Sequence, residues 1–554
     1  MNWLKNLIRP DLRDLAAYSS ARTEAGDFAP GIGIDANEFP WPPFGPMAAQ
    51  YNVNRYPDPQ PAALRQQLAN IWGVQAEQLL LGRGSDEGID ALMRLFCRAG
   101  IDQILICPPT YGMYKVSATV QGAEVLSVPL RPDWQLDVPA ILKTCTEKTK
   151  LIFVPSPNAP MGHMMKKEDI LSLCKARAEQ SLIVVDEAYI EFTDSPEGMV
   201  PELKNAPNLV ILRTMSKAHA LAGERVGAVL GAPELIESLQ KILAPYPLTQ
   251  SSIRIALDAL SPNGLIQATE RRRLLISERE RMARLLPQSS QVVSVFPSVV
   301  NFLLVQTKDA KAFMQQLMHF GILPRDRSRD IPNTVRLSIG TPEENGLVLK
   351  ALGVEANEAA SPLTPRLFST RRATKETAID VTVNLDAPSF LKIETGIGFY
   401  DHMLSQLASH GGFGLELHCK GDLEIDQHHT IEDCALALGE ALKAALGDKR
   451  GIARFGFTAP LDEASANVVV DLSGRPYASF TGTLPAPTVG GMSSEMVPHF
   501  FRSLATAMGA AIQVTVQGEN THHMVEASFK ATGRALRQAF QREGQNIPST
   551  KGVL

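Results

Sequence analysis

The stretch Asp426-Gln-His-His-Thr-Ile-Glu-Asp433 decides how the C-terminal part of this chain is interpreted. Apolar residues with a helical period follow it, so His428 and Glu432 are expected one helical turn apart on the same face. His429 lies about 100° further round the helix axis and is expected to serve a second point. Two imidazoles and a carboxylate at a helix start suit a transition metal. A surface histidine pair that binds nothing is the competing interpretation.

A second copy of the motif, His522-His-Met-Val-Glu526, excludes that competing interpretation. The repeat extends upstream, where His499 repeats His402 and Gly518-Glu519 repeats Gly421-Asp422. An internal duplication of one β/α unit explains this pattern, so two half-domains are expected, each with an upstream histidine and a His-His-x-x-Glu motif.

The duplication predicts a two-metal centre. Divided between two ions, the candidates supply three imidazoles and one carboxylate to each, with positions left open for a substrate. Mn, Fe or Zn fit such ligands better than Mg or Ca. Because the two histidines of a pair point apart, each pair is expected to serve both metals, and which imidazole meets which ion stays open. The candidate ligands are His402, His428, His429, Glu432, His499, His522, His523 and Glu526.

The composition is that of a multidomain globular chain. With 554 residues, of which 44% are hydrophobic and 20% charged, two to four domains are expected. The net charge of -5 gives no sign of nucleic-acid or membrane binding. The six cysteines form no C-x-x-C pair, which argues against a disulfide framework or a zinc knuckle. Because the chain shows neither a signal sequence nor a bilayer-length apolar run, a cytoplasmic enzyme is expected.

The N-terminal part of the chain alternates strand-like apolar runs with helical patterns. This alternation predicts an α/β domain with a largely parallel sheet. In such sheets, ligands gather at the carboxyl ends of the strands. The expected strands are 103–107, 151–154, 181–185 and 209–212.

Three loops in this part carry polar residues that fit one site. Gly82–Gly88 opens a helix whose first backbone amides could hold a phosphate. Asp186 directly follows a buried strand, where an unpaired charge would be costly. Lys217 follows the next strand. A lysine at a strand end that faces a carboxylate and a phosphate loop indicates a functional role rather than a solvated surface charge.

These residues resemble the fold-type I pyridoxal-phosphate enzymes, and closely the histidinol-phosphate aminotransferase family. The resemblance runs from about Pro10 to about Leu352. It implies an aminotransferase over 1–354, with a large domain of about 30–245 and a small domain of about 246–354 that includes the N-terminal segment. In the small domain, strands are expected at 299–305 and 335–339 and a helix at 310–320. The matching stretches are Tyr56–Pro59, Pro108–Tyr114, Asp186–Phe192 and Ser216–Gly223.

The same resemblance implies the roles of individual residues. Lys217 would form the Schiff base with pyridoxal phosphate and move the substrate proton. Asp186 would pair with the pyridinium nitrogen and keep the ring an electron sink, and Tyr189 would bond the ring hydroxyl. For the other contacts, Tyr111 would stack on the ring, Ser85, Ser216 and Arg225 would hold the phosphate, and Tyr56 would reach the cofactor of the other subunit in a dimer. Arg336 would bind the substrate carboxylate and Arg325 the substrate phosphate.

One loop departs from the family pattern. Where the family reads Pro-Asn-Asn-Pro-Thr-Gly, with the second Asn on the ring hydroxyl, this chain reads Pro157-Asn-Ala-Pro-Met-Gly162 and has Ala159 at that place. The loss of one neutral hydrogen bond costs roughly 0.5–1.5 kcal/mol, at most about tenfold in rate. We therefore expect a detuned but active site.

The segment 355–370 is small, polar and proline-containing, which predicts a linker. Residues 371–554 resemble the imidazoleglycerol-phosphate dehydratase family, which implies an α+β domain of two duplicated β/α halves. By that resemblance the eight ligands hold two manganese ions, and 24 subunits form a cage with metal sites completed across subunits. Glu376 matches a substrate-binding carboxylate and is the candidate for proton transfer. Arg454, Arg475, Ser549 and Lys551 match the substrate-phosphate contacts.

Together the two resemblances imply a bifunctional histidine-biosynthesis enzyme. The dehydratase product, imidazole-acetol phosphate, is the ketone that the aminotransferase aminates with glutamate, so the two domains would catalyse consecutive steps. Two alternatives remain. The C-terminal half could be a cage scaffold with structural metals, or the N-terminal half could prefer another, aromatic, amino acid.

Overall fold

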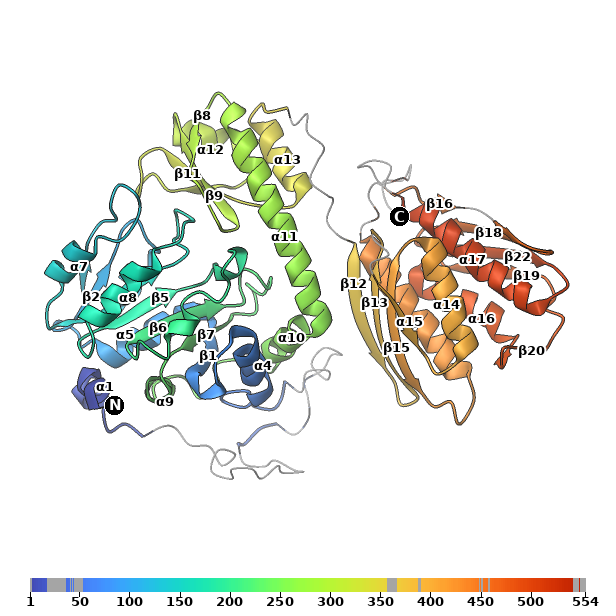
Figure 1. Cartoon of the computed structure of the whole chain (residues 1–554), viewed down its shortest axis with the longest axis horizontal. Coiled ribbons are helices and arrows are strands. Elements are labelled where there is room, and N and C mark those ends of the chain that lie inside the picture. The colour runs from blue at the N-terminus through green and yellow to red at the C-terminus, as the bar shows by residue number, and fades with distance from the viewer. Residues whose placement is uncertain are drawn as a thin grey trace. The chain divides into compact units, whose positions relative to one another are not determined.

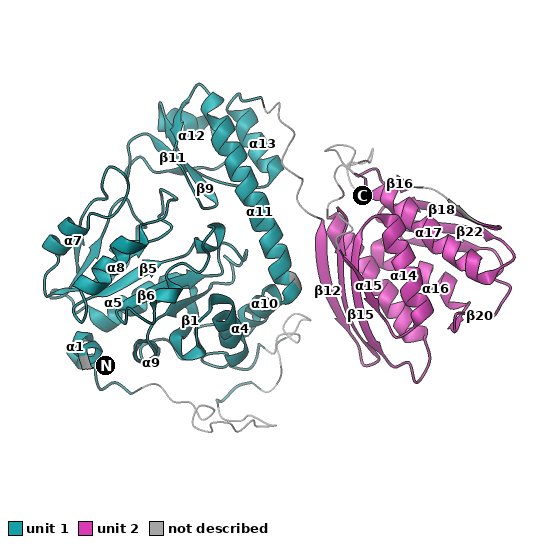
Figure 2. Ribbon diagram, viewed as in Figure 1, with its two compact units in different colours: residues 1–363 teal, residues 364–554 magenta. Residues whose placement is uncertain are grey.

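The computed structural model describes residues 2–16, 36–39, 41, 43, 53–355, 366–386, 390–447, 449, 452–456, 459–541 and 548. The chain divides into two compact units, 1–363 and 364–554 (Figure 2). Among the described residues, no helix combines the length and the apolar character needed to traverse a bilayer.

A seven-stranded sheet forms the centre of the first unit, in the order β1-β7-β6-β5-β4-β2-β3 (Figure 1). β7 runs antiparallel to both of its neighbours, and the other pairings are parallel. The four expected strands are confirmed as β2, β4, β5 and β6. The bounds are β1 Leu79–Arg83, β2 Gln103–Ile106, β3 Glu124–Ser127, β4 Thr149–Pro155, β5 Leu182–Asp186, β6 Leu209–Thr214 and β7 Val226–Leu230.

Helices cover both faces of this sheet because its strands are apolar on both sides. One core layer packs α4, α7, α8 and α10 against it, and the opposite layer packs α1, α5, α6 and α9. This arrangement confirms the α/β fold class. The bounds are α1 Asn2–Leu7, α4 Ala62–Trp72, α5 Gly84–Phe96, α6 Met113–Gln121, α7 Val138–Thr144, α8 Lys167–Ala176, α9 Pro233–Gln240 and α10 Gln250–Ala259, with short 3-10 turns at Pro10–Leu12, Ala76–Gln78, Ile190–Phe192, Val200–Glu202 and Leu286–Gln288.

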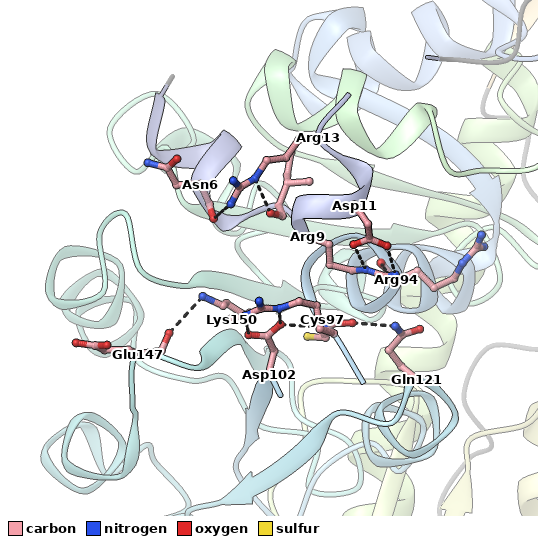
Figure 3. Close-up of polar contacts among 12 residues, drawn as sticks. Asn6, Arg9, Asp11, Arg13, Arg94, Cys97, Asp102, Gln121, Glu147 and Lys150 are labelled. Atoms are coloured by element: carbon pink, nitrogen blue, oxygen red, sulfur yellow. Dashed lines mark hydrogen bonds and ion pairs between the residues drawn. The ribbon is translucent and has the colours of Figure 1, made fainter. Parts of the chain in front are cut away.

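The start of the chain belongs with the large domain, which corrects its expected place beside the small domain. Leu4 and Leu7 of α1 are buried in the same apolar cluster as α5 and α9. Arg9 donates from Nη1 to the carbonyl of Arg94 in α5 at 3.0 Å, and it pairs with Asp11 at 2.7 Å (Figure 3). Burial of these leucines on the sheet layer holds the segment there.

A four-stranded sheet, ordered β10-β11-β9-β8, builds the small domain with three helices. The expected helix and the strand at 335–339 are confirmed as α12 and β11. The strand expected at 299–305 starts only at Phe302, because Val299 instead donates its N–H to Gly162 in the cofactor-side loop at 2.8 Å. The bounds are α11 Pro262–Leu285, β8 Val292–Val295, β9 Phe302–Thr307, α12 Ala310–His319, β10 Arg325–Asp326, β11 Thr334–Ser338 and α13 Pro342–Ala351.

The second unit repeats one pattern twice. In each half, a central strand pairs antiparallel with one neighbour and parallel with the other. The helices then pack across the halves, α14 on α17 and α15 on α16, inside one apolar core. First-half bounds are β12 Leu367–Ala373, β13 Thr377–Asn384, β14 Leu391–Glu394, α14 Gly398–Gly411, β15 Gly414–Gly421 and α15 His428–Leu446. Second-half bounds are β16 Phe455–Gly456, β17 Ala459–Leu461, β18 Ala464–Asp471, β19 Tyr477–Thr481, β20 Thr488–Val489, β21 Met492–Ser493, α16 Met496–Met508, β22 Ala511–Gln517 and α17 Thr521–Phe540.

The second unit starts upstream of the expected position. β12 already begins at Leu367, inside the segment predicted to be a linker, and Leu367 is 6% exposed. Pairing with Asn384 of β13 extends the hairpin to that residue. The small, polar residues of 355–370 led to a predicted domain boundary that lies too late in the chain. The edge strand of a sheet can carry polar residues on its outer face, so such a composition does not exclude a strand.

Candidate active sites

A cavity of about 170 Å³ lies at the carboxyl ends of the central strands of the first unit. Parallel strands end at the same sheet edge, so residues far apart in sequence meet there. Most of the predicted cofactor and substrate residues of this unit line it: Ser85, Tyr111, Asp186, Tyr189, Ser216, Lys217, Arg225 and Arg336. Ala159, Asp86 and Tyr114 line it too.

Asp186 is buried at the end of β5 and receives a hydrogen bond from the Tyr114 hydroxyl at 2.8 Å. Burial raises the pKa of Asp186 to about 6, and the Tyr114 hydroxyl opposes that rise. The backbone N–H of Ala188 donates to the other carboxylate oxygen at 3.2 Å. With these donors the carboxylate is ionised at neutral pH, as a partner for a pyridinium nitrogen must be.

Lys217 follows β6, with its Nζ 5.5 Å from the centre of the Tyr189 ring. Burial, and then the positive charge of Arg336, lower the pKa of the Lys217 ammonium. A lowered pKa leaves more of the amine neutral, which is the form that attacks a carbonyl carbon. Arg336 itself lies over the ring of Phe302 at 5.0 Å.

Another part of the cavity lining carries a guanidinium and two hydroxyl groups that could hold a phosphate. Arg225 donates from Nη1 to the Ser216 hydroxyl at 3.3 Å and from Nη2 to Asp86 at 3.1 Å. A Cβ added at Gly84 would stand 2.8 Å from that guanidinium, so the glycine leaves room for the approach. Ser85 sits in the first turn of α5, where free backbone amides attract an anion.

Ala159 packs in an apolar cluster with Val300 and Phe302 of the small domain, beside Tyr189. The preceding Asn158 is fully buried and turned away, since its amide donates to the Pro109 carbonyl at 3.2 Å. The structure therefore places an apolar contact at Ala159, where the resemblance leads one to expect an asparagine amide.

Arg325 lines a neighbouring cavity of about 800 Å³, and Arg336 lines both cavities. The two arginines also face each other across the β10–β11 pair. Tyr56, by contrast, does not line the cofactor cavity of its own chain. It stacks on Tyr246 at 4.6 Å and is 50% exposed, so its role toward another subunit stays a prediction.

Two clusters of metal-ligand residues form in the second unit, and each combines both halves. His402 of α14 meets His522 and Glu526 of α17. His499 of α16 meets His428 and Glu432 of α15. Within each cluster the histidine Nε2 atoms lie 3.4–3.7 Å from the shared carboxylate. This crossing follows from the packing of α14 on α17 and of α15 on α16, and three convergent donors of this kind fit a transition metal.

The second histidine of each pair lies outside these clusters. His429 bonds through Nδ1 to Asp422 at 3.1 Å, and His523 bonds through Nδ1 to Glu463 at 2.8 Å. The rings of each pair have centroids 6.1 Å apart and only one of them joins a cluster, which agrees with the helical step. Lys530 pairs with Glu526 at 2.8 Å, so the two clusters also differ in charge.

The remaining predicted residues of this unit are partly placed. Glu376 lies at the turn before β13, with an oxygen 3.9 Å from His429 Nε2. Arg454 is engaged with Asp471 at 2.7 Å and with the Pro548 carbonyl at 2.9 Å, and Arg475 is exposed. Ser549 and Lys551 lie outside the described residues.

Sequence reasoning missed several residues that touch these sites. Tyr114 was inside a matched stretch and lies in the first turn of α6, three residues after Tyr111. Asp422 belongs to the repeat, which by itself assigns it no role. Asp86 lies inside the predicted loop Gly82–Gly88 but had no role assigned to it, and nothing in the sequence singled out Lys530. Glu463 is recognised from the equivalent pairings of β13 and β18.

Comparisons with known proteins agree with the family resemblance of each of the two units. The chain matches the family "Aminotransferase class I and II" over residues 35–352 and the family "Imidazoleglycerol-phosphate dehydratase" over residues 395–536. The histidinol-phosphate aminotransferase of Xylella fastidiosa (strain 9a5c) is 43% identical over 355 residues, which cover 63% of this chain and 95% of that protein. The histidinol-phosphate aminotransferase 1 of Haemophilus influenzae (strain 86-028NP) is 42% identical over 352 residues, which cover 63% of this chain and 98% of that protein.

Solved structures agree with the fold of the first unit. The histidinol-phosphate aminotransferase of Clostridium acetobutylicum aligns with a TM-score of 0.50 at 25% identity, covering 54% of this chain and 90% of that one. The Sinorhizobium meliloti enzyme in complex with pyridoxal-5'-phosphate aligns with the same score and identity, covering 57% and 88%. The chain therefore belongs to the class I and II aminotransferase family, in a fusion with an imidazoleglycerol-phosphate dehydratase domain.

Proposed function

We propose that this chain is a bifunctional enzyme of histidine biosynthesis. The second unit dehydrates imidazoleglycerol phosphate to imidazole-acetol phosphate, and the first unit transaminates that ketone with glutamate to L-histidinol phosphate. The observation that carries the proposal is the presence, in one chain, of a lysine-and-aspartate cavity and two histidine-carboxylate clusters.

In the first unit, pyridoxal phosphate would supply the electron sink that makes the substrate Cα proton acidic. The chain's residues would position it. Asp186 would hold a proton on the ring nitrogen, Tyr189 would donate to the ring hydroxyl, and Arg225 with the two serines would bind the phosphate. Lys217, with its lowered pKa, would carry the proton between substrate atoms. Arg336 and Arg325 would hold the anionic ends of glutamate and of the phosphorylated ketone.

In the second unit, two manganese ions are the proposed metals. Each three-residue cluster supplies two imidazoles and one carboxylate, which leaves positions for further ligands. His429 and His523 lie outside both clusters of their own chain, which supports completion of the sites by another subunit of a cage. Glu376 would accept or donate the substrate proton, and Arg454 and Arg475, with Ser549 and Lys551, would bind its phosphate.

One incubation tests the proposal. The protein is mixed with imidazoleglycerol phosphate, glutamate, pyridoxal phosphate and Mn²⁺, and histidinol phosphate is followed by mass spectrometry. Its formation is the expected result, and its absence would reject the proposal. If imidazole-acetol phosphate accumulates without amination, the first unit acts on another amino acid. If added ketone is aminated but dehydration never occurs, the second unit is a scaffold.

A further inference from the structure

The hairpins of the two halves of the second unit each carry a glutamate just before an equivalent strand. Glu376 immediately precedes β13 and Glu463 immediately precedes β18. The strands correspond, because β13 pairs antiparallel with β15 as β18 pairs with β22. The loops after β15 and β22 correspond as well, which makes Glu519 the counterpart of Asp422. The duplication thus supplied each half with two carboxylates near its second histidine.

The two halves use these carboxylates differently. In the first half the loop residue Asp422 bonds His429 Nδ1, with its two oxygens at 3.1 and 3.3 Å. In the second half the hairpin residue Glu463 does so, with Oε2 2.8 Å from His523 Nδ1. Glu463 is held there by the backbone N–H of Asn520, which donates to its other oxygen at 3.2 Å. Its loop counterpart, Glu519, is exposed.

Glu376 is consequently not the partner of the imidazole beside it. Its oxygen lies 3.9 Å from His429 Nε2, beyond hydrogen-bond distance, and its side chain is 52% exposed. A neutral imidazole has one N–H and one lone pair, so a carboxylate that accepts from Nδ1 directs the Nε2 lone pair outward. His429 and His523 therefore both have an Nε2 lone pair free to bind a metal. Of the two hairpin glutamates, Glu376 lies near Nε2 of its histidine, whereas Glu463 bonds Nδ1.

We propose that Asp422 and Glu463 are positioning residues: they come from non-equivalent segments of the two halves, yet each accepts a hydrogen bond from Nδ1 and so orients His429 or His523 to offer Nε2 to metal. This rests on the proposed dehydratase function.

The test titrates Mn²⁺ into the chelator-stripped full chain by calorimetry and measures dehydration at saturating Mn²⁺. Glu463→Ala and Asp422→Ala should weaken Mn²⁺ binding about 10- to 100-fold, as loss of a ligand's outer partner does, and excess metal should restore turnover. Glu463→Gln keeps an oxygen acceptor and should recover most of the affinity. Glu376→Gln should bind Mn²⁺ within about threefold of the unsubstituted protein and lose turnover at any metal concentration. Glu519→Gln is the matched control and should change neither quantity.

Each other result overturns the positioning role. Unchanged Mn²⁺ affinity in Glu463→Ala would remove its positioning role. Loss of turnover in Glu463→Ala that excess metal does not restore would make it a second proton-transfer group. Failure of the dehydratase proposal itself looks different, since the unsubstituted chain would then bind no Mn²⁺ or would not dehydrate substrate, and there would be no ligand to orient.

Discussion

Replacing Tyr114 by Phe removes one hydroxyl and leaves the ring in place. That hydroxyl donates to Asp186 at 2.8 Å inside a site where both side chains are buried. The Phe153 ring, stacked on the Tyr114 ring at 4.7 Å, can pack against phenylalanine in the same way. The substitution therefore tests one hydrogen bond rather than the core.

The size of the effect follows from the chemistry of that bond. A hydrogen bond to a charged group is worth about 1.5–3 kcal/mol, and 1.36 kcal/mol corresponds to one pKa unit. Because the hydroxyl stabilises the ionised form, its loss raises the pKa of Asp186 from about 6 by roughly one to two units. At neutral pH a large part of Asp186 would then be protonated and unable to pair with a pyridinium nitrogen.

The assay is kcat/KM for transamination of imidazole-acetol phosphate across pH 5 to 9.5, with pyridoxal phosphate saturating. We expect the acidic limb to move upward by about one to two pH units and the rate to approach that of the unsubstituted protein at high pH. Tyr111→Phe is the control, because the Tyr111 hydroxyl bonds Asp86 at 3.1 Å and not Asp186. Its acidic limb should not move. An unshifted limb in Tyr114→Phe would refute the assigned role.

Three further predictions concern backbone clearance, the altered loop and the metals. In Gly227→Ala the new Cβ would stand 2.5 Å from the Gly84 carbonyl carbon and 2.6 Å from the Ser85 nitrogen, so pyridoxal phosphate affinity, measured by absorbance titration, should fall at least about tenfold. Gly223→Ala, with nothing within 4 Å, should retain the affinity. Ala159→Asn should change the cofactor spectrum and alter transamination by up to about tenfold, and unchanged values would contradict the reading of this loop. Chelation should abolish dehydration and spare amination of added ketone, whereas particle disassembly with dehydration intact would favour the scaffold alternative.

The sequence by itself determined the two families, the sheet class and nearly all of the candidate residues. Short apolar runs at β2, β4, β5 and β6 are local signals, since strands buried on both faces are continuously hydrophobic. The repeated His-His-x-x-Glu motif is also local, because one helical turn sets the direction of each side chain. The helical step was enough to predict that His428 and His429 point apart.

Only the tertiary structure decided which residues meet. The sequence left open which imidazole meets which ion, and helix packing joins His402 to Glu526 and His499 to Glu432 across the halves. The bond from Tyr114 to Asp186 and the exchange of roles between Asp422 and Glu463 are contacts between distant segments. Such contacts depend on how helices and sheets pack, which no local period or propensity records. The motifs therefore define the ligands, and the packing defines the sites.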